Sequence, residues 1–413
     1  TNRSTAGVPA SIATSSQQQQ PCAKISVRPS SPSPHSRPSQ KQISAHQIQP
    51  EIQERAKGRV SSADDALSFK DFYRISQEID RGSFSRVYGC YHRYTAVKFA
   101  VKVIDRRSLS RKADDTVFRE ARILQELQNK RRDAITTDGE EDVGFVRLVD
   151  FFIEPTRFFL VMDFMAGLTL FDRVLDKHYY AEDDARILAT RILKAVAFMH
   201  RHNVVHRDLK PQNILLADKE DDTNVFIGDF GFATIIRPVL DEKTNRMTRR
   251  VLRQKCGTPS YVAPEVIAGK PYDQAADLWS LGVIVFFVIG GYPPFVDFNS
   301  RQSMFRQIIA GQFEFHETDW SGVSKQAKDF ISSLLTVDPS KRMSASQALF
   351  HPWILTGDTA KPPMVPPSAK DTSTTSKKGK GVRKAIKAAF KQSSSRHLQA
   401  SGENVHRNRT SSQ

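Results

Sequence analysis

The sequence has 413 residues, which is enough for one two-lobed domain with tails or for two to three ordinary domains. Its net charge of +16 is concentrated at the ends, because residues 1–70 carry +5 and residues 356–413 carry +9, whereas residues 71–355 carry only +2. The folded part therefore lacks the basic character of a nucleic-acid-binding domain, and we predict no specific nucleic-acid partner.

The three cysteines, Cys22, Cys90 and Cys256, are odd in number and widely spaced. This pattern argues against a disulfide framework or a zinc knuckle and indicates a reducing compartment. The first residues show no signal-peptide pattern, and the longest apolar run, 281–289, is too short to span a bilayer, so we predict a buried helix there. We expect a cytoplasmic location and leave a nuclear one open.

Residues 1–70 are rich in Ser, Gln and Pro, with a glutamine run at 17–20 and a Pro-Ser cluster at 29–38. Large apolar side chains are too sparse there to offset the entropy of an ordered chain, so we predict a disordered tail. A strand-like pattern begins at Phe72.

The next segment has the pattern of a sheet followed by a helix. A hairpin turn is predicted around Gly82, and two Ala-Val-Lys repeats follow, ending at Lys98 and Lys102. Both lysines lie on one face of a strand, because their offset is even. Glu120 lies in a helical segment, whereas the polar residues 128–144 are predicted to form a solvated surface loop.

Two apolar segments come next, a predicted buried strand over 158–163 and a predicted helix over 182–200. Six apolar side chains of this helix are expected on one side: Ile187, Leu188, Ile192, Leu193, Val196 and Met199. The helix leads directly into a stretch of charged and amide side chains.

The stretch 206–213 reads His-Arg-Asp-Leu-Lys-Pro-Gln-Asn. Asp208 can accept a proton from an attacking hydroxyl, and Lys210 can neutralise charge that develops on a phosphoryl group. Asn213 can hold a metal ion from the same loop. Asp229 opens an Asp-Phe-Gly tripeptide sixteen residues later and offers a second oxygen ligand.

These two motifs, in this order, resemble the catalytic and metal-binding loops of eukaryotic protein kinases. Further motifs are similar to those of the calcium/calmodulin-dependent (CAMK) group and lie at Gly257–Glu265, Asp277–Gly282, Gly291–Phe295, Trp320, Ala327–Ile331, Asp338–Arg342 and His351–Trp353. The resemblance covers about residues 72–354.

The resemblance implies an α+β, two-lobed protein-kinase fold, with a β-rich small lobe that carries one main helix and a helical large lobe. The kinase domain would span 71–354, with the small lobe at about 71–163 and the large lobe at about 164–354. Residues 1–70 would be the disordered tail, and residues 355–413 a proline linker with a basic, regulatory-type tail.

The resemblance also implies transfer of the γ-phosphoryl group of ATP to Ser or Thr hydroxyls of protein substrates, with Mg²⁺. Asp208 and Lys210 would be catalytic, and the presence of Lys210 favours Ser/Thr over Tyr substrates. Asn213 and Asp229 would hold Mg²⁺. Residues 229–265 would form the activation segment.

Lys102 would anchor ATP, because it lies fifteen residues after Val87, and Glu120 would pair with it. Lys98 is expected to be a solvated strand lysine. The ATP pocket would be lined by residues of both lobes: Ile79, Gly82, Val87, Ala100, Lys102, Met162, Asp163, Met165 and Leu215.

Two structural contacts are implied as well. One is an ion pair between Glu265 and Arg342. The other is an internal hydrophobic stack formed by Leu124, Leu148, His206 and Phe230.

The sequence departs from the family pattern in the glycine-rich loop, where Asp80 and Ser85 occupy two of the three glycine positions. A carboxylate near phosphate groups repels them, so we expect reduced nucleotide affinity. This departure supports an alternative interpretation, a kinase-fold scaffold with weak or no activity.

Three other departures concern substrate choice and activation. Thr169 and Gln212 stand where relatives that select an upstream basic residue carry Glu, and Gln254 stands where many relatives carry a phosphorylatable Thr. The loss of charged acceptors predicts weak selection for an upstream Arg. We also expect activity that does not require phosphate at position 254.

The C-terminal tail begins with a proline-containing linker and continues into the basic segment 377–396. If this segment is helical, Val382, Ile386, Ala389 and Phe390 share one face. A basic amphipathic helix suits calmodulin or a membrane surface. Contact with nucleic acid and a solvated, disordered tail are the remaining alternatives.

Overall fold

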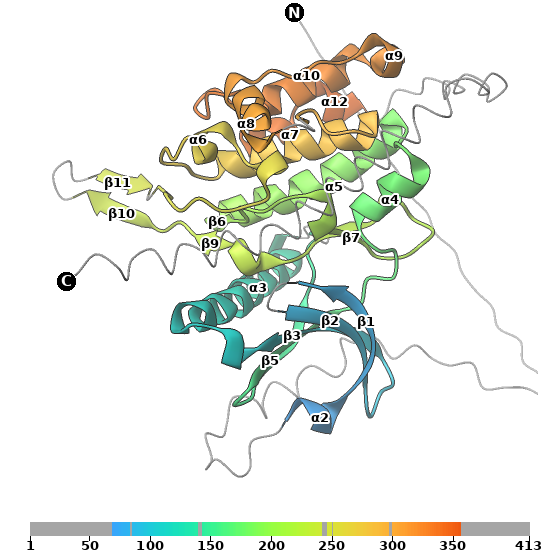
Figure 1. Cartoon of the computed structure of the whole chain (residues 1–413), viewed down its shortest axis with the longest axis vertical. Helices are drawn as coiled ribbons and strands as arrows, with labels where there is room; N and C mark the ends of the chain where they lie inside the picture. The colour runs from blue at the N-terminus through green and yellow to red at the C-terminus, as the bar shows by residue number, and fades with distance from the viewer. Residues whose placement is uncertain are drawn as a thin grey trace, which may run out of the picture. The chain divides into compact units, whose positions relative to one another are not determined.

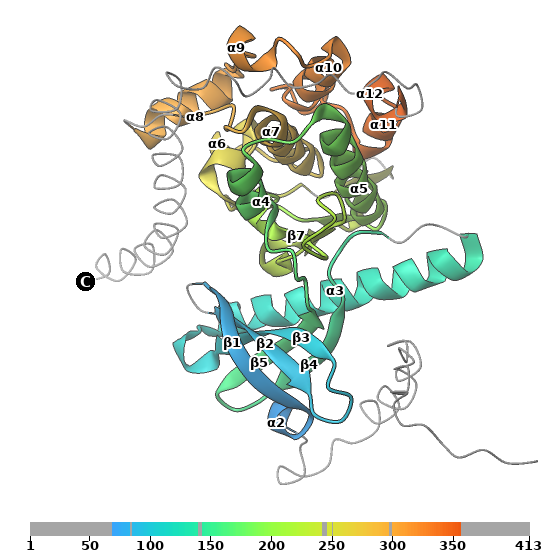
Figure 2. The ribbon, with the colours of Figure 1, turned by 90° about the vertical axis from the view of Figure 1, so that its right-hand side faces the viewer.

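The computed structural model describes residues 68–82, 85–138, 143–241, 246–249, 251–296 and 300–356. Within these residues, an antiparallel sheet with one long helix is followed by a mainly helical lobe (Figures 1 and 2). This arrangement confirms the predicted α+β, two-lobed fold. Most of the predicted N-terminal tail and the basic segment 377–396 lie outside the described residues.

The small lobe contains a five-stranded sheet with the order β1-β2-β3-β5-β4 and antiparallel neighbours. Its elements are α2 (Phe69–Phe72), β1 (Tyr73–Arg81), β2 (Ser85–His92), β3 (Lys98–Asp105), the 3-10 helix η2 (Arg106–Ser108), α3 (Arg111–Asp138), β4 (Leu148–Ile153) and β5 (Arg157–Asp163).

Both faces of the small-lobe sheet are covered. On one face, Val117 and Ala121 of α3 pack against Phe158 and Leu160 of β5. An aromatic cluster covers the other face, and it includes Phe69 of α2, which is only 1% exposed although it lies in the predicted tail.

Phe69 anchors the first described residues to the sheet. Its ring stacks on Phe159 with centroids 4.5 Å apart, and its backbone N–H donates to Glu154 Oε1 at 3.2 Å. The described residues therefore include α2 and its Ser68 cap, which precede the strand pattern that the sequence shows from Phe72.

Helix α3 is longer than predicted. Residues 128–138 belong to it, so the loop predicted for that stretch is wrong. Gln128 exchanges two side-chain hydrogen bonds with the backbone of Leu148, at 3.0 and 3.1 Å, and the Arg131 guanidinium lies 5.5 Å from the centre of the Phe145 ring. These contacts hold the second half of α3 against the residues that lead into β4.

The first part of the large lobe holds two helices and the short strands around the catalytic loop. Its elements are α4 (Leu170–Lys177), α5 (Glu182–Arg201), β6 (Val204–Val205), η3 (Pro211–Asn213), β7 (Ile214–Leu216), β8 (Val225–Ile227), η4 (Phe230–Phe232), β9 (Thr234–Ile235), β10 (Pro238–Asp241), β11 (Arg246–Arg249) and η5 (Pro259–Tyr261).

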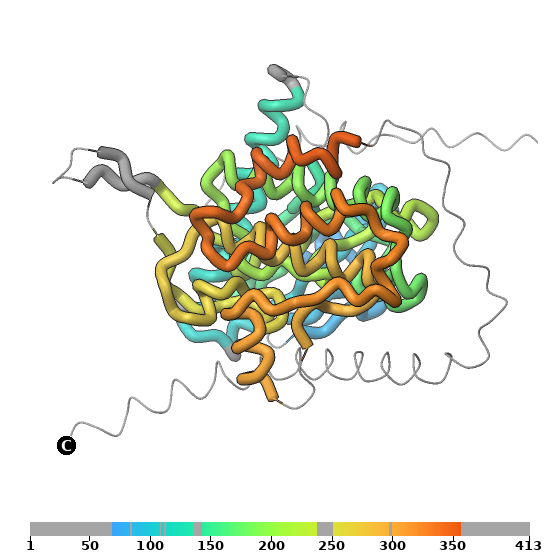
Figure 3. Tube along the Cα trace, turned by 90° about the horizontal axis from the view of Figure 1, so that it is seen from above, coloured from blue at the N-terminus to red at the C-terminus, as the bar shows by residue number. Residues whose placement is uncertain are grey.

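The remainder is helical: α6 (Pro264–Ile267), α7 (Ala275–Gly290), α8 (Arg301–Ala310), α9 (Glu317–Trp320), α10 (Lys325–Leu334), α11 (Ala345–Leu349) and α12 (Pro352–Leu355). Seen from above, α8 to α12, coloured orange to red, lie toward the viewer, and the blue strands of the small lobe lie on the far side (Figure 3). No helix in the described ranges is long and apolar enough to cross a membrane.

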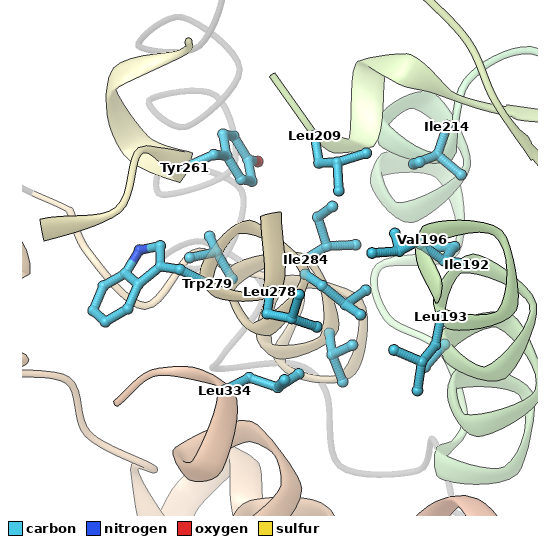
Figure 4. Close-up of a cluster of buried hydrophobic side chains, with 14 of the residues drawn as sticks. Ile192, Leu193, Val196, Leu209, Ile214, Tyr261, Leu278, Trp279, Ile284 and Leu334 are labelled. Atoms are coloured by element: carbon cyan, nitrogen blue, oxygen red, sulfur yellow. The ribbon is translucent and has the colours of Figure 1, made fainter. Parts of the chain in front are cut away.

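The core of the large lobe is built around α7, which is apolar on all sides and buried along nearly its whole length. The predicted buried helix over 281–289 is thereby confirmed. Ile284 of α7 faces Val196 of α5, and Leu334 of α10 packs from another side (Figure 4). Gly282 permits the close approach of α10, since a Cβ there would lie 2.9 Å from the Cβ of Leu334.

Five of the six apolar residues predicted on one side of α5 are buried, but Ile187 is 42% exposed. Its predicted place on the same side as the other five is wrong. The buried stripe is centred on Leu188, Ile192 and Val196, and successive helical residues lie about 100° apart, so Ile187 points to the opposite edge.

The predicted hydrophobic stack is present. Leu124 and Phe230 belong to one buried cluster, and Leu148 packs against it. The rings of His206 and Phe230 meet edge to face with centroids 5.0 Å apart. Because Leu124 is on α3 and Phe230 follows β8, this stack connects the two lobes.

The predicted ion pair between Glu265 and Arg342 is also present. The guanidinium donates to both carboxylate oxygens, at 2.8 and 2.9 Å, and both side chains are buried. Arg342 also donates to the carbonyl oxygens of Ala275 and Thr336, at 2.8 and 2.9 Å. The pair therefore ties α6 and α7 to the loop before α11.

Candidate active site

The catalytic loop between β6 and η3 is held by a buried carboxylate of α7. Asp277 accepts the N–H groups of His206 and Arg207, each at 2.9 Å, and lies 2.9 Å from His200 Nε2. Burial opposes its ionisation, but His200 and His206 outweigh that effect and lower the pKa of Asp277. This anchoring supports the strained φ of +69° at Arg207.

Asp208 lies at the centre of a short-range network and is 3% exposed. Its Oδ1 accepts the N–H and the hydroxyl of Thr258, both at 2.8 Å, and its Oδ2 accepts from Lys210 Nζ at 2.7 Å. Lys210 Nζ is also 2.9 Å from the Thr258 hydroxyl oxygen, and Asn213 donates to the Asp208 carbonyl at 2.8 Å. These contacts fix the carboxylate's position.

Sequence reasoning did not single out Thr258. The signal was its place in the Gly-Thr-Pro motif that opens 257–265. Gly257 has φ of +104°, and a Cβ there would lie 2.7 Å from the Arg207 carbonyl oxygen. The glycine therefore lets the activation segment approach the catalytic loop closely enough for Thr258 to reach Asp208.

Lys102 joins the two lobes through charge. Its Nζ lies 2.7 and 3.1 Å from the carboxylate oxygens of Glu120 on α3, and 2.9 Å from Asp229 Oδ1. The pairing with Glu120 is as the spacing predicted, whereas the contact with Asp229 was not anticipated. Asp229 has φ of +54°, a second strained position in the site.

The ionisation of this triad follows from its geometry. Lys102 holds the pKa of Asp229 well below its usual range, and burial opposes but does not cancel this effect. Burial alone would lower the pKa of Lys102, yet Asp229 and Glu120 raise it. Burial raises the pKa of Glu120, since its side chain is only 4% exposed. The lysine is therefore held as a cation.

The prediction that Lys98 is a solvated strand lysine is wrong. Its side chain is half-buried, and its Nζ lies 3.7 Å from the centre of the Phe164 ring. A cation at this distance from an aromatic face is attracted by the ring. Lys98 therefore makes a structural contact beside the segment that joins the lobes, and it is separate from the Lys102 triad.

Met162 and Asp163 end β5, next to the segment that joins the lobes. The strand register places Ala100 of β3 opposite Met162. The carboxylate of Asp163 is held by Arg147, with distances of 2.9 and 3.1 Å. Within the described part of the chain, the N–H of Met165 has no hydrogen-bond partner. It is therefore available as a donor to the edge of a heterocyclic base.

The other predicted pocket residues lie on β1, β2 and β7. Ile79 is 43% exposed, and Val87 and Leu215 are half-buried. Gly82 closes the loop between β1 and β2 by donating its N–H to the Ser85 carbonyl at 2.9 Å. Apolar side chains with exposed surface on both lobes suit contact with a purine ring.

Asn213 and Asp229 fit a magnesium ion. The backbone N–H of Gly228 donates to the Asn213 carbonyl at 2.8 Å, which brings β7 and β8 together at this point. The Asn213 side-chain nitrogen is used by Asp208, so its oxygen is the atom left for a cation. Amide and carboxylate oxygens are the ligands that Mg²⁺ prefers.

Among the described residues, no group of three or more His, Cys, Asp and Glu side chains is arranged to hold a metal ion.

The three departures noted in the sequence have structural explanations or consequences. Thr169 caps α4, where its hydroxyl donates to Asp172 Oδ2 at 2.6 Å and accepts the Asp172 N–H at 3.2 Å. Gln212 Oε1 is buried without a hydrogen-bond partner among the described residues. Gln254 Oε1 accepts from Arg207 at 3.4 Å, so a neutral amide occupies that position.

This fold and this site define a protein kinase. Residues 73–354 match the family model described as Protein kinase domain, and the chain belongs to that family. Its relatives place it in the CAMK group of eukaryotic protein kinases.

Two relatives illustrate the similarity. The chain is 39% identical over 282 residues to Myosin light chain kinase A of Dictyostelium discoideum, covering 68% of this chain and 88% of that protein. It is 38% identical over 294 residues to Calcium/calmodulin-dependent protein kinase type 1 of Caenorhabditis elegans, covering 71% and 77%. Neither the site nor the relatives support the alternative of an inactive scaffold.

Proposed function

We propose that the chain is a serine/threonine kinase that transfers the γ-phosphoryl group of ATP, with Mg²⁺, to hydroxyl groups of protein substrates. The observation that carries this proposal is the Asp208 network, because a fixed, buried carboxylate beside Lys210 is suited to accept a hydroxyl proton next to a transferring phosphoryl group. The names of the relatives support protein substrates.

The proposed mechanism relies on positioning and charge. Asp208 orients the substrate hydroxyl and accepts its proton, while Lys210 neutralises charge on the phosphoryl oxygens. Lys102, held by Glu120, binds the phosphate groups of ATP. Asn213 and Asp229 would hold Mg²⁺, which supplies further charge neutralisation when it is bound. The reaction requires no covalent intermediate on this set of residues.

A phosphotransfer assay tests the proposal. The purified full chain is incubated with labelled ATP, Mg²⁺ and an array of peptides that contain Ser, Thr or Tyr as the only hydroxyl residue. We expect label on Ser and Thr peptides and loss of transfer when EDTA removes Mg²⁺. Label confined to Tyr peptides would contradict the serine/threonine assignment. Failure to label any peptide, despite measurable ATP binding, would contradict the kinase proposal.

We also propose that calcium-loaded calmodulin regulates the chain through 377–396. This segment carries eight basic and no acidic residues, with Val382, Ile386, Ala389 and Phe390 on one helical face. Two of the relatives are named calcium/calmodulin-dependent kinases of types 1 and II. We retain the cytoplasmic location as part of this proposal, because the three scattered cysteines indicate a reducing compartment.

Calorimetry of a peptide spanning 375–398 tests this regulation. We expect binding to calmodulin with calcium, none with chelator, and a loss of at least about 2 kcal/mol in Phe390→Ala, the peptide's only aromatic position. Binding to anionic vesicles that ignores calcium would support a membrane role instead. No binding in any condition would leave a solvated tail.

A further inference from the structure

A groove with a volume of about 500 Å³ lies on the outward face of α5. Its walls come from α5, β8 and α12, and α5 and α12 are neighbours in Figure 2. The lining includes Arg186, Ile187, Arg191, Lys194, Phe226 and Ile354. None of the residues assigned to catalysis, ATP or Mg²⁺ lines it, and its volume is within the range of binding pockets.

The groove combines an apolar floor with a basic rim. Ile187 is 42% exposed, and it shares one helical face with Arg191 and Lys194 at offsets of four and seven. Within the described part of the chain, no acidic side chain lines the groove. Arg186 pairs at 2.9 Å with Asp183, which is largely exposed and outside the lining.

Arg191 keeps its charge facing this surface. Its guanidinium donates to the neutral side-chain oxygen of Asn224 at 2.8 Å, and Asp221, whose pKa Arg191 helps to lower, lies outside the groove lining. The remaining charge favours an occupant with carboxylates beside apolar side chains. The chain's own tails, with net charges of +5 and +9, have the wrong sign for this rim.

We propose that this groove is a docking site for an acidic, apolar peptide segment of the protein substrates. The inference rests on the proposed kinase function. It gives the chain a means of substrate recognition that does not depend on Thr169 and Gln212, the two neutral residues that stand where relatives with a preference for basic substrates carry Glu. β8 begins at Val225 in the groove and ends two residues before Asp229, so the docking site and the reacting centre share one lobe.

The test compares the full chain with a double variant, Ile187→Glu/Lys194→Glu, which changes two exposed positions of α5. A matched control, Lys70→Glu/Ile153→Glu, makes the same change of charge at exposed positions of the small lobe. Each labelled chain is applied to an array of twelve-residue peptides of random sequence, and an unchanged unfolding midpoint verifies that each variant is folded.

We expect a set of peptides to bind the wild type and the control but to lose at least tenfold in signal with the double variant. This set should be enriched in Asp or Glu next to Leu, Ile, Val or Phe. An identical set for all three chains would overturn the proposal. A lost set that is basic or free of acidic residues would also overturn it, and would point to another occupant.

A kinetic measurement links docking to phosphotransfer. One of the selected peptides is joined through a flexible linker to a short Ser peptide that the wild type phosphorylates. We expect KM to fall at least fivefold for the wild type and not for the double variant, with kcat unchanged in both. An equal KM with and without the docking peptide would overturn the substrate role. If no Ser peptide is phosphorylated, the proposed kinase function fails, while the array result still reports on the groove.

Discussion

Asp208 Oδ1 accepts two hydrogen bonds from Thr258, one from the backbone N–H and one from the hydroxyl, each at 2.8 Å. The two residues belong to different segments, the catalytic loop and the activation segment. Lys210 contacts both of them, so the three side chains form a closed set. The position of the activation segment is thereby transmitted to the proposed base.

We predict that Thr258→Val, which keeps the shape and removes the hydroxyl, lowers kcat by roughly 10- to 100-fold, because misplacing a reacting group has effects of this size. Thr258→Ser should retain most activity, since it restores the hydroxyl. Steady-state kinetics at saturating ATP will show the difference. Equal losses in both variants would contradict a role that is specific to the hydroxyl.

Lys102 and Lys98 should respond differently to the same substitution. Lys102→Arg should lower kcat/KM by at least about 100-fold, because the planar guanidinium cannot take the place of a compact ammonium between Glu120 and Asp229. Lys98→Arg should leave activity nearly unchanged, since Arg also stacks on the Phe164 ring. The reverse ranking would show that the ATP-anchoring lysine has been misassigned.

Substrate selection should be weak for an upstream Arg. The Thr169 hydroxyl is occupied in capping α4, and Gln212 is neutral, so neither supplies a charged acceptor. A positional peptide library should show little enrichment of Arg for the wild type. Thr169→Asp combined with Gln212→Glu should raise the enrichment of Arg several-fold, because both changes add a carboxylate acceptor. Asp is also a good N-cap, so α4 should still form. A sharp upstream-Arg requirement in the wild type would refute this prediction.

The buried pair of Glu265 and Arg342 should be structural. Glu265→Gln leaves an uncompensated buried guanidinium and should lower the free energy of unfolding by about 3–5 kcal/mol. Urea unfolding followed by tryptophan fluorescence measures this change. Lys341→Ala removes a surface ion pair with Asp338 and should have no measurable effect. Similar changes in both variants would mean that burial does not determine the strength of these pairs.

Short-range motifs and fixed spacings were enough to name the candidate site residues. Lys102 was distinguished from Lys98 by its distance from Val87, and the structure places Glu120 beside it. Thr258 was quoted within its motif without a role, because its contact with Asp208 depends on how the activation segment folds back. The pairing of Lys102 with Asp229 likewise joins residues 127 apart and leaves no local trace in the sequence.

The predictions that the structure contradicts concern residues whose conformation or burial depends on tertiary contacts. Residues 128–138 are polar, so they resemble a loop, yet they contain no Gly or Pro and are held by Gln128 and Arg131. Phe69 lies at the end of a mostly polar segment, and only the sheet face that it covers makes it part of the core. Ile187 has helical spacing but faces the groove of α5.

The most direct test of the central claim is the single-turnover rate of Asp208→Asn with ATP and Mg²⁺. The substrate is an unphosphorylated peptide that the wild-type chain phosphorylates. Asn keeps the size of the side chain but cannot accept the hydroxyl proton, so we predict a fall of at least about 100-fold in the rate with unchanged ATP affinity. A variant that transfers the phosphoryl group at the wild-type rate would contradict the assignment of Asp208 as the base.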